Sequence, residues 1–132
     1  MYNELRYRGE VLNILAVGLG GFIGAVLRYL IGLIHVKETM VFPIKTFCIN
    51  ILGCLLIGLI TVLASRNPEI SPRWILFLKV GICGGFTTFS TFALETTDLI
   101  KGGHMAMAFL YAVLSAVIGI TVIFGIDMAA GK

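Results

Sequence analysis

Apolar residues fall into four long runs that are separated by short polar connections. The runs occupy approximately residues 11–35, 43–64, 73–101 and 104–127. Each is as long as the ~20 mostly apolar residues that an α-helix needs to cross the hydrocarbon core of a bilayer. The connections hold helix-ending residues, among them Pro68, Pro72 and the pair Gly102–Gly103. We therefore predict an all-α membrane protein with four transmembrane helices in a single domain, residues 1–132.

The composition indicates that this chain is surrounded by lipid. Of its 132 residues 58% are hydrophobic and 13% are charged, and the mean hydropathy is +1.01. A soluble domain typically carries about 25% charged residues, and a small one has a large surface to hydrate. These values argue against a soluble enzyme and a disordered chain. The modest net charge of +3 argues against a nucleic-acid-binding protein.

Small residues and weak charge asymmetry both bear on assembly. Pairs of small residues four apart let helix backbones approach closely; they are Gly20 with Gly24, Ala112 with Ala116, and Ser115 with Gly119.

Loop lysines and arginines set the orientation of a membrane protein in the bilayer. The side with both termini carries five of them and the other side three, namely Arg6, Arg8, Arg66, Arg73 and Lys132 against Lys37, Lys45 and Lys101. This small bias fits either insertion in both orientations, which permits an antiparallel dimer, or one orientation with a cytosolic N-terminus.

The third run contains an unusual segment in which glycines are followed by hydroxyl residues. Gly81, Gly84 and Gly85 precede the string Thr87-Thr88-Phe89-Ser90-Thr91-Phe92. Glycines and β-branched residues are poor helix formers, which predicts a break near residues 84–88. In lipid a broken helix is tolerated only where it is buried in protein or lines a cavity, and the freed carbonyls can hold ions. The alternative is a simple kink whose backbone groups bond to the hydroxyls.

Other polar and aromatic groups lie at membrane depth, where they are costly and usually functional. Thr46 shares a helix face with Asn50, and Tyr111 shares one with Ser115. Each pair either lines a water-filled pathway or forms hydrogen bonds with a neighbouring helix.

The rings of Phe89 and Phe92 lie three residues apart and have positive edges that can contact an anion, although such pairs also face lipid. Arg28 is either an anion-attracting vestibule or an anchor that binds a backbone carbonyl. Between Trp74 and about Leu94 of the third run, Lys79 is the one charged residue.

Taken together, these segments resemble the CrcB/Fluc family of fluoride channels. The resemblance covers nearly the whole chain: the four short-looped helices, residues Gly21–Tyr29, Asn50 with Gly53, and residues Gly84–Phe92. The last string, Gly-Gly-Phe-Thr-Thr-Phe-Ser-Thr-Phe, is highly specific. The resemblance implies a dual-topology homodimer of two antiparallel subunits in the cell inner (plasma) membrane, with two fluoride pores.

The resemblance also implies roles for individual residues. Phe89 and Phe92 would be ring-edge fluoride contacts and Asn50 the pore amide donor. Hydroxyl groups would line the rest of the pore, namely those of Ser90, Thr91, Thr46, Tyr111 and Ser115. Arg28 would be a vestibule arginine, and the backbone carbonyls of Gly84 and Thr87 would hold a structural sodium ion at the dimer interface. Glu95 has a family counterpart near the pore, and Gly119 stands where some members carry a hydroxyl.

The implied activity is passive export of toxic fluoride from the cytoplasm. A pore must replace the water of this tightly hydrated ion with many weak donors, while binding it loosely enough to release it. One alternative is a proton-coupled small multidrug exporter, which needs a membrane-embedded carboxylate. The first run has none, and Glu95 is the sole plausible substitute. A second alternative is a packing subunit without transport. Neither a catalytic constellation nor a phosphate-binding loop is present, so we do not expect an enzyme.

Overall fold

The computed structural model describes residues 2–36 and 40–131, and all the regular structure within these ranges is helical. Lys37 and Lys132, which enter the charge count above, lie outside the described residues. Within the described ranges, four stretches are long and apolar enough to cross a membrane, which confirms the predicted all-α membrane class. The elements are α1 (Tyr2–Gly32), α2 (Ile44–Arg66), α3 (Pro72–Ile75), η1 (Leu76–Cys83), α4 (Gly84–Phe86), α5 (Phe89–Lys101) and α6 (Met105–Ala129).

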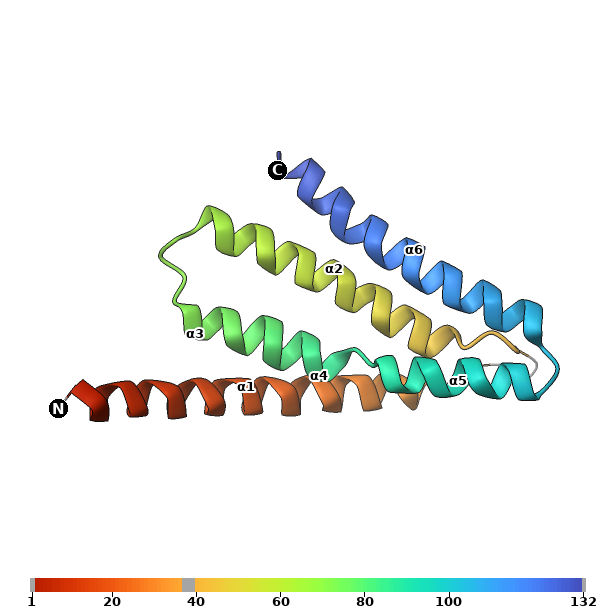
Figure 1. Cartoon of the computed structure of the whole chain (residues 1–132), viewed down its shortest axis with the longest axis horizontal. Coiled ribbons are helices and arrows are strands. Elements are labelled where there is room, and N and C mark those ends of the chain that lie inside the picture. Colours follow the sequence, from red (N-terminus) through yellow and green to blue (C-terminus); the bar gives the residue numbers. More distant parts are fainter. Residues whose placement is uncertain (1, 37–39, 132) are drawn as a thin grey trace.

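The two chain ends and the α2–α3 loop lie at one end of the bundle, as four successive crossings require (Figure 1). Helix α1 packs along η1 and α4, and α2 packs along α6. Helix α1 begins earlier than the apolar run, because the polar stretch before residue 11 continues the helix. An ion pair between Arg6 and Glu10, one turn apart, supports this extension.

The third span is built from several pieces. Residues Leu76–Cys83 form a π-helix, α4 adds one turn, and α5 starts only at Phe89. Thr87 (φ −83°, ψ 160°) and Thr88 (φ −151°, ψ 114°) are extended, so the break falls on these two threonines. The preceding glycines remain helical, contrary to the expectation that their poor propensity ends the helix.

The glycines of the third span serve close packing against α1. A Cβ atom on Gly20 would lie 2.9 Å from the Cα atom of Gly81, and one on Gly85 would lie 3.0 Å from the Cα atom of Gly21. Gly24 similarly faces the backbone of α4. Backbone contact of this kind holds two helices together where lipid supplies no hydrophobic drive. Five glycines therefore form one interface between the first and third spans, namely Gly20, Gly21, Gly24, Gly81 and Gly85.

Replacing Gly24 with alanine is expected to destabilise the protein by about 1–3 kcal/mol, because the added methyl group overfills a packed interface. Its Cβ would lie 2.7 Å from the backbone nitrogen of Phe86. Gly18→Ala is the matched control, since nothing lies within 4 Å of a Cβ at that position. Thermal unfolding in detergent should show a lower midpoint for Gly24→Ala alone. Equal midpoints for both variants would contradict the interface.

A single chain buries little of its apolar surface. The main buried cluster of the described residues is Leu99, Ala108 and Tyr111, with aromatic residues packed around it. Many large apolar side chains on all four spans stay exposed. Lipid or another protein surface must therefore cover most of this molecule.

Candidate functional site

The break in the third span is held open by the side chain of Asn50. Its Nδ2 donates to the carbonyl oxygen of Thr88 (3.1 Å), and its Oδ1 accepts from the backbone N–H of Thr88 (2.9 Å). Both backbone groups of Thr88, which the helix no longer pairs, are thus satisfied by one amide from α2. An amide has a second N–H donor, and Asn50 also lines a cavity at the break. The residue therefore serves as a clamp and keeps one donor for a ligand.

Hydroxyl groups gather at the N-terminus of α5. The Oγ1 atom of Thr88 caps the helix by accepting from the backbone N–H of Thr91 (3.2 Å). The same Oγ1 lies 3.0 Å from the Oγ1 of Thr91 and 3.3 Å from the Oγ of Ser90. The first N–H groups of a helix have no intrahelical partner and carry its positive dipole end. The break thus brings hydroxyls and backbone donors to one point.

The two phenylalanines of α5 lie next to each other beside this point. The ring centroids of Phe89 and Phe92 are 5.6 Å apart, with 39° between the ring planes. The ring of Phe92 also packs against that of Tyr111 on α6, at 5.0 Å. Phe89 is 80% exposed in the single chain, whereas Phe92 is half-buried. The pair therefore leads from the interior of the subunit to its outer face.

A carboxylate lies behind the aromatic pair. Glu95 accepts from the hydroxyl of Thr46 through Oε1 (2.7 Å) and from the hydroxyl of Tyr111 through Oε2 (2.8 Å). Tyr111 is completely buried and Thr46 nearly so. The hydroxyl hydrogens of these two residues point at Glu95, so they are already used.

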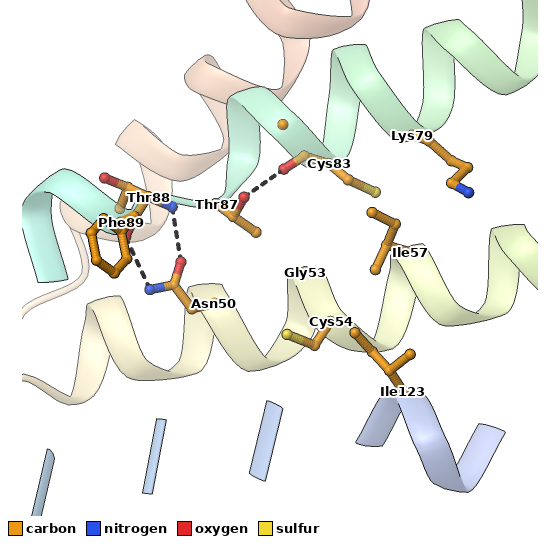
Figure 2. Close-up of a pocket in the computed structure, with 11 residues that line it drawn as sticks. Asn50, Gly53, Cys54, Ile57, Lys79, Cys83, Thr87, Thr88, Phe89 and Ile123 are labelled. Atoms are coloured by element: carbon orange, nitrogen blue, oxygen red, sulfur yellow. Dashed lines mark hydrogen bonds between the residues drawn. The ribbon is translucent and has the colours of Figure 1, made fainter. Parts of the chain in front are cut away.

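A cavity of about 400 Å³ opens on one side of the break (Figure 2). Asn50 and Phe89 lie at one end of it, and Lys79 lies at the other end. Thr87 and Thr88 form part of its lining from the break itself. The remaining wall comes from α2, η1, α4 and α6, through Gly53, Cys54, Ile57, Cys83, Gly84 and Ile123.

A second cavity, of about 380 Å³, is lined by Thr88 as well. Its charged and hydroxyl residues are Arg28, Lys45, Thr46, Thr91 and Glu95. Lys45 caps α1 by donating to the carbonyl oxygen of Gly32 (2.8 Å). Because Thr88 lines both cavities, the two are adjacent at the break.

Arg28 reaches the third span as well as the second cavity. Its Nε atom donates to the carbonyl oxygen of Gly85 at 3.2 Å. This is the backbone contact that the sequence left open as an alternative to a vestibule. Lining the cavity and binding this carbonyl are compatible, since a guanidinium has five N–H donors.

Two carbonyls of the break have no hydrogen-bond donor among the residues that the structure describes. Within the described ranges 2–36 and 40–131, the carbonyl oxygens of Gly85 and Thr88 accept from Arg28 and Asn50, whereas those of Gly84 and Thr87 accept no hydrogen bond. Both residues line the first cavity. Oxygen ligands of this type suit hard cations such as sodium. The donor set therefore fits the cation that the resemblance implies.

The structure gathers most, but not all, of the sequence candidates. Asn50, Phe89, Thr91, Thr46 and Arg28 line one or other cavity, and Tyr111 contacts Phe92. Ser90 joins the hydroxyl cluster and is exposed.

The fourth-helix candidates differ from this group. The Oγ atom of Ser115 is buried without a hydrogen-bond partner among the described residues, and Ser115 lines neither cavity. A Cβ atom on Gly119 would lie 3.2 Å from the Sγ of Cys54, so the glycine makes room for that side chain.

Sequence reasoning missed Lys79 as a cavity residue. A charge within a membrane span was the available signal. The sequence also left the role of Glu95 undecided, because its hydrogen-bond partners lie on other helices and only the folded structure shows them.

Comparison with known proteins finds similarity over most of the chain. Residues 15–126 match the family described as "CrcB-like protein, Camphor Resistance (CrcB)". A protein of Ruminiclostridium cellulolyticum named fluoride-specific ion channel FluC is 51% identical over 108 residues, covering 80% of this chain and 82% of the relative. A protein of the same name from Phocaeicola vulgatus is 46% identical over 122 residues, covering 89% and 98% of the two chains. A third, from Chlorobium chlorochromatii, is 46% identical over 102 residues, covering 77% and 79%.

Proposed function

The chain belongs to the CrcB family, and on this premise we propose that it is a fluoride channel through which cytoplasmic fluoride leaves the cell by passive diffusion. The names of its relatives support the ion. The protein crosses the membrane several times and is not an enzyme. We place it in the cell inner (plasma) membrane, where a leak of fluoride would lower the cytoplasmic concentration of this toxic ion.

One observation carries this proposal: the break at Thr87 and Thr88 brings several weak anion donors together. The donors are the remaining N–H of Asn50, the hydroxyls around Thr88, the N-terminus of α5 and the ring edges of Phe89 and Phe92. Such groups can replace the hydration shell of fluoride and still release the ion, as conduction requires.

The state of Glu95 supports a passive channel over a proton-coupled exporter. An exporter of that class needs a membrane carboxylate that exchanges protons and substrate. Both oxygens of Glu95 already accept hydroxyl hydrogens, from Thr46 and Tyr111. The carboxylate therefore orients these two hydroxyl groups, whereas an exporter would need its oxygens free to bind protons and substrate. None of the compared relatives carries an exporter name.

We propose that two subunits assemble antiparallel into a homodimer. Phe89 is 80% exposed in the single chain. The first cavity, which is open to the outside of the subunit, is lined by polar groups at the break, among them Asn50 and Thr88. Lipid would leave those polar groups unpaired, whereas a second subunit would cover them. The weak charge bias between the two sides supports insertion in both orientations.

We propose that the carbonyls of Gly84 and Thr87, two from each subunit, hold one structural sodium ion at this interface. The bound ion would supply a positive charge that joins the two broken spans. Across a two-fold axis the same patch meets itself, so two subunits double the ligand count.

Replacing sodium with the large organic cation N-methyl-D-glucamine is expected to weaken the dimer and lower fluoride release, because a large cation cannot fit between backbone carbonyls. Size-exclusion chromatography and chemical cross-linking in detergent measure the dimer independently of transport. An unchanged dimer together with unchanged fluoride release in sodium-free buffer would reject the sodium site.

Fluoride release from liposomes tests the proposed function directly. Proteoliposomes loaded with potassium fluoride or potassium chloride, in a buffer that also contains sodium, receive a potassium ionophore, so that charge does not accumulate. We expect rapid fluoride release without a proton gradient, read by a fluoride electrode, and retention of chloride. Release that requires an imposed proton gradient would favour the exporter. Release no faster than from protein-free liposomes would reject the channel.

A further inference from the structure

Lys79 is a cation within the third span that forms no ion pair with an acidic residue of the described ranges. It follows the first residue of α3 by seven positions, which places it roughly 10 Å along the helix from that end. In the part of the chain that the structure describes, the only ion pair joins Arg6 and Glu10. A charged side chain at membrane depth is costly and marks a functional site by default. The charge of Lys79 therefore needs an explanation beyond packing.

The position of Lys79 within the first cavity supplies one. Lys79 lies at the end of the cavity opposite Asn50 and Phe89, with the walls of α2 and η1 between them (Figure 2). The intervening wall includes the apolar side chains of Ile57 and Ile123. Between low-dielectric walls of this kind, the field of a charge is focused along the open space of the cavity.

A corresponding arrangement exists beyond the break. Thr88 lines the first cavity and also the second, which Arg28 and Lys45 line. A path through both cavities at Thr88 thus has basic residues along it on each side of the break. In the second cavity Glu95 offsets part of that charge, whereas the first has no acidic residue among the described residues that line it.

We propose that Lys79 draws anions into the first cavity and sets the rate at which fluoride enters the pore from that side. This inference rests on the proposed fluoride channel. Lys79 lies away from the donors of Asn50 and Phe89. It therefore raises the local fluoride concentration without binding the ion tightly at the site from which it must be released. A lysine that merely anchored the span would extend its ammonium to the headgroups and leave anion entry unaffected.

The test compares fluoride release by Lys79→Arg, Lys79→Met and Lys79→Glu channels in liposomes. We expect near wild-type release for arginine, a several-fold loss for methionine and a larger loss for glutamate. The differences should shrink when impermeant salt rises from 0.01 to 1 M, since the Debye length falls from about 30 to about 3 Å. Lys101→Met is the matched control, because it removes the same charge from the exposed end of α5.

A chemical rescue keeps the inference testable if the methionine variant folds poorly. Lys79→Cys is made in a background without Cys48, Cys54 and Cys83, because two of these thiols line the same cavity. An aminoethyl thiosulfonate, which restores a positive charge, should raise release, and a sulfonatoethyl reagent should lower it. Equal release by all Lys79 variants, a loss independent of salt, or rescue by both reagents would overturn the role of Lys79 alone. Wild-type liposomes that release no fluoride would overturn the channel as well.

Discussion

Asn50→Ala is expected to lower fluoride release by at least about 30-fold while the four helices persist. The substitution leaves the N–H and the carbonyl of Thr88 without their partners, which lie 2.9 and 3.1 Å from the Asn50 amide. Each buried backbone group left unpaired costs about 1–3 kcal/mol. Two such groups therefore cost at least about 2 kcal/mol, and each 1.36 kcal/mol corresponds to a factor of ten in rate. The same change removes the amide N–H that we assign to fluoride.

Asn67→Ala is the matched control for this experiment. The amide of Asn67 also donates to a backbone carbonyl, that of Leu63 at 2.8 Å, but it lies exposed at the end of α2. We expect near wild-type fluoride release from this variant in the same liposome assay. Wild-type release from Asn50→Ala would reject both the clamp and the pore assignment of Asn50.

Phe92→Ile is expected to lower fluoride release by about 10-fold with the dimer intact. Isoleucine retains an apolar side chain of similar bulk, but it lacks the positive ring edge that we assign to the anion. It also loses the ring contacts with Phe89 and Tyr111, at 5.6 and 5.0 Å. Aromatic pairs contribute about 0.5–1.5 kcal/mol each beyond their buried area, and about 1.36 kcal/mol, within the range for one pair, corresponds to a factor of ten. Fluoride release and size-exclusion chromatography provide the two readouts.

Phe109→Ile separates this effect from a general response to losing an aromatic ring in the membrane. Phe109 lies on α6 and is 72% exposed, and it lines neither cavity at the break. Fluoride release should stay close to wild type in this variant. A similar loss in both variants would attribute the Phe92 effect to bilayer packing, and no loss in either would remove Phe92 from the pore.

Hydrophobic patterning alone predicted the spans, because lipid requires each crossing segment to be a long apolar helix. The ends of the runs agree with α2 and α6 to within a few residues. The start of α1 was missed, since a helix that continues into water is stabilised by polar pairs such as Arg6 with Glu10 and not by an apolar face.

The break was predicted for a reason that is only partly right. Poor helix propensity placed it near residues 84–88, and the extended residues are Thr87 and Thr88. Gly85 stays helical because its contact with α1 outweighs its intrinsic preference, and Gly84 stays helical beside it. What opens the helix at Thr88 is the amide of Asn50, which supplies from another span the two hydrogen bonds that the helix gives up.

The sequence by itself determined that this chain lies in a membrane, how often it crosses, and which span carries hydroxyls, phenylalanines and glycines together. These properties follow from composition and local periodicity. Only the tertiary structure decided which groups meet: Glu95 with two hydroxyls, Arg28 with a carbonyl, and Lys79 with an open cavity. The partners in each of these contacts lie on different helices, and their distances depend on how the helices cross, which no local pattern encodes.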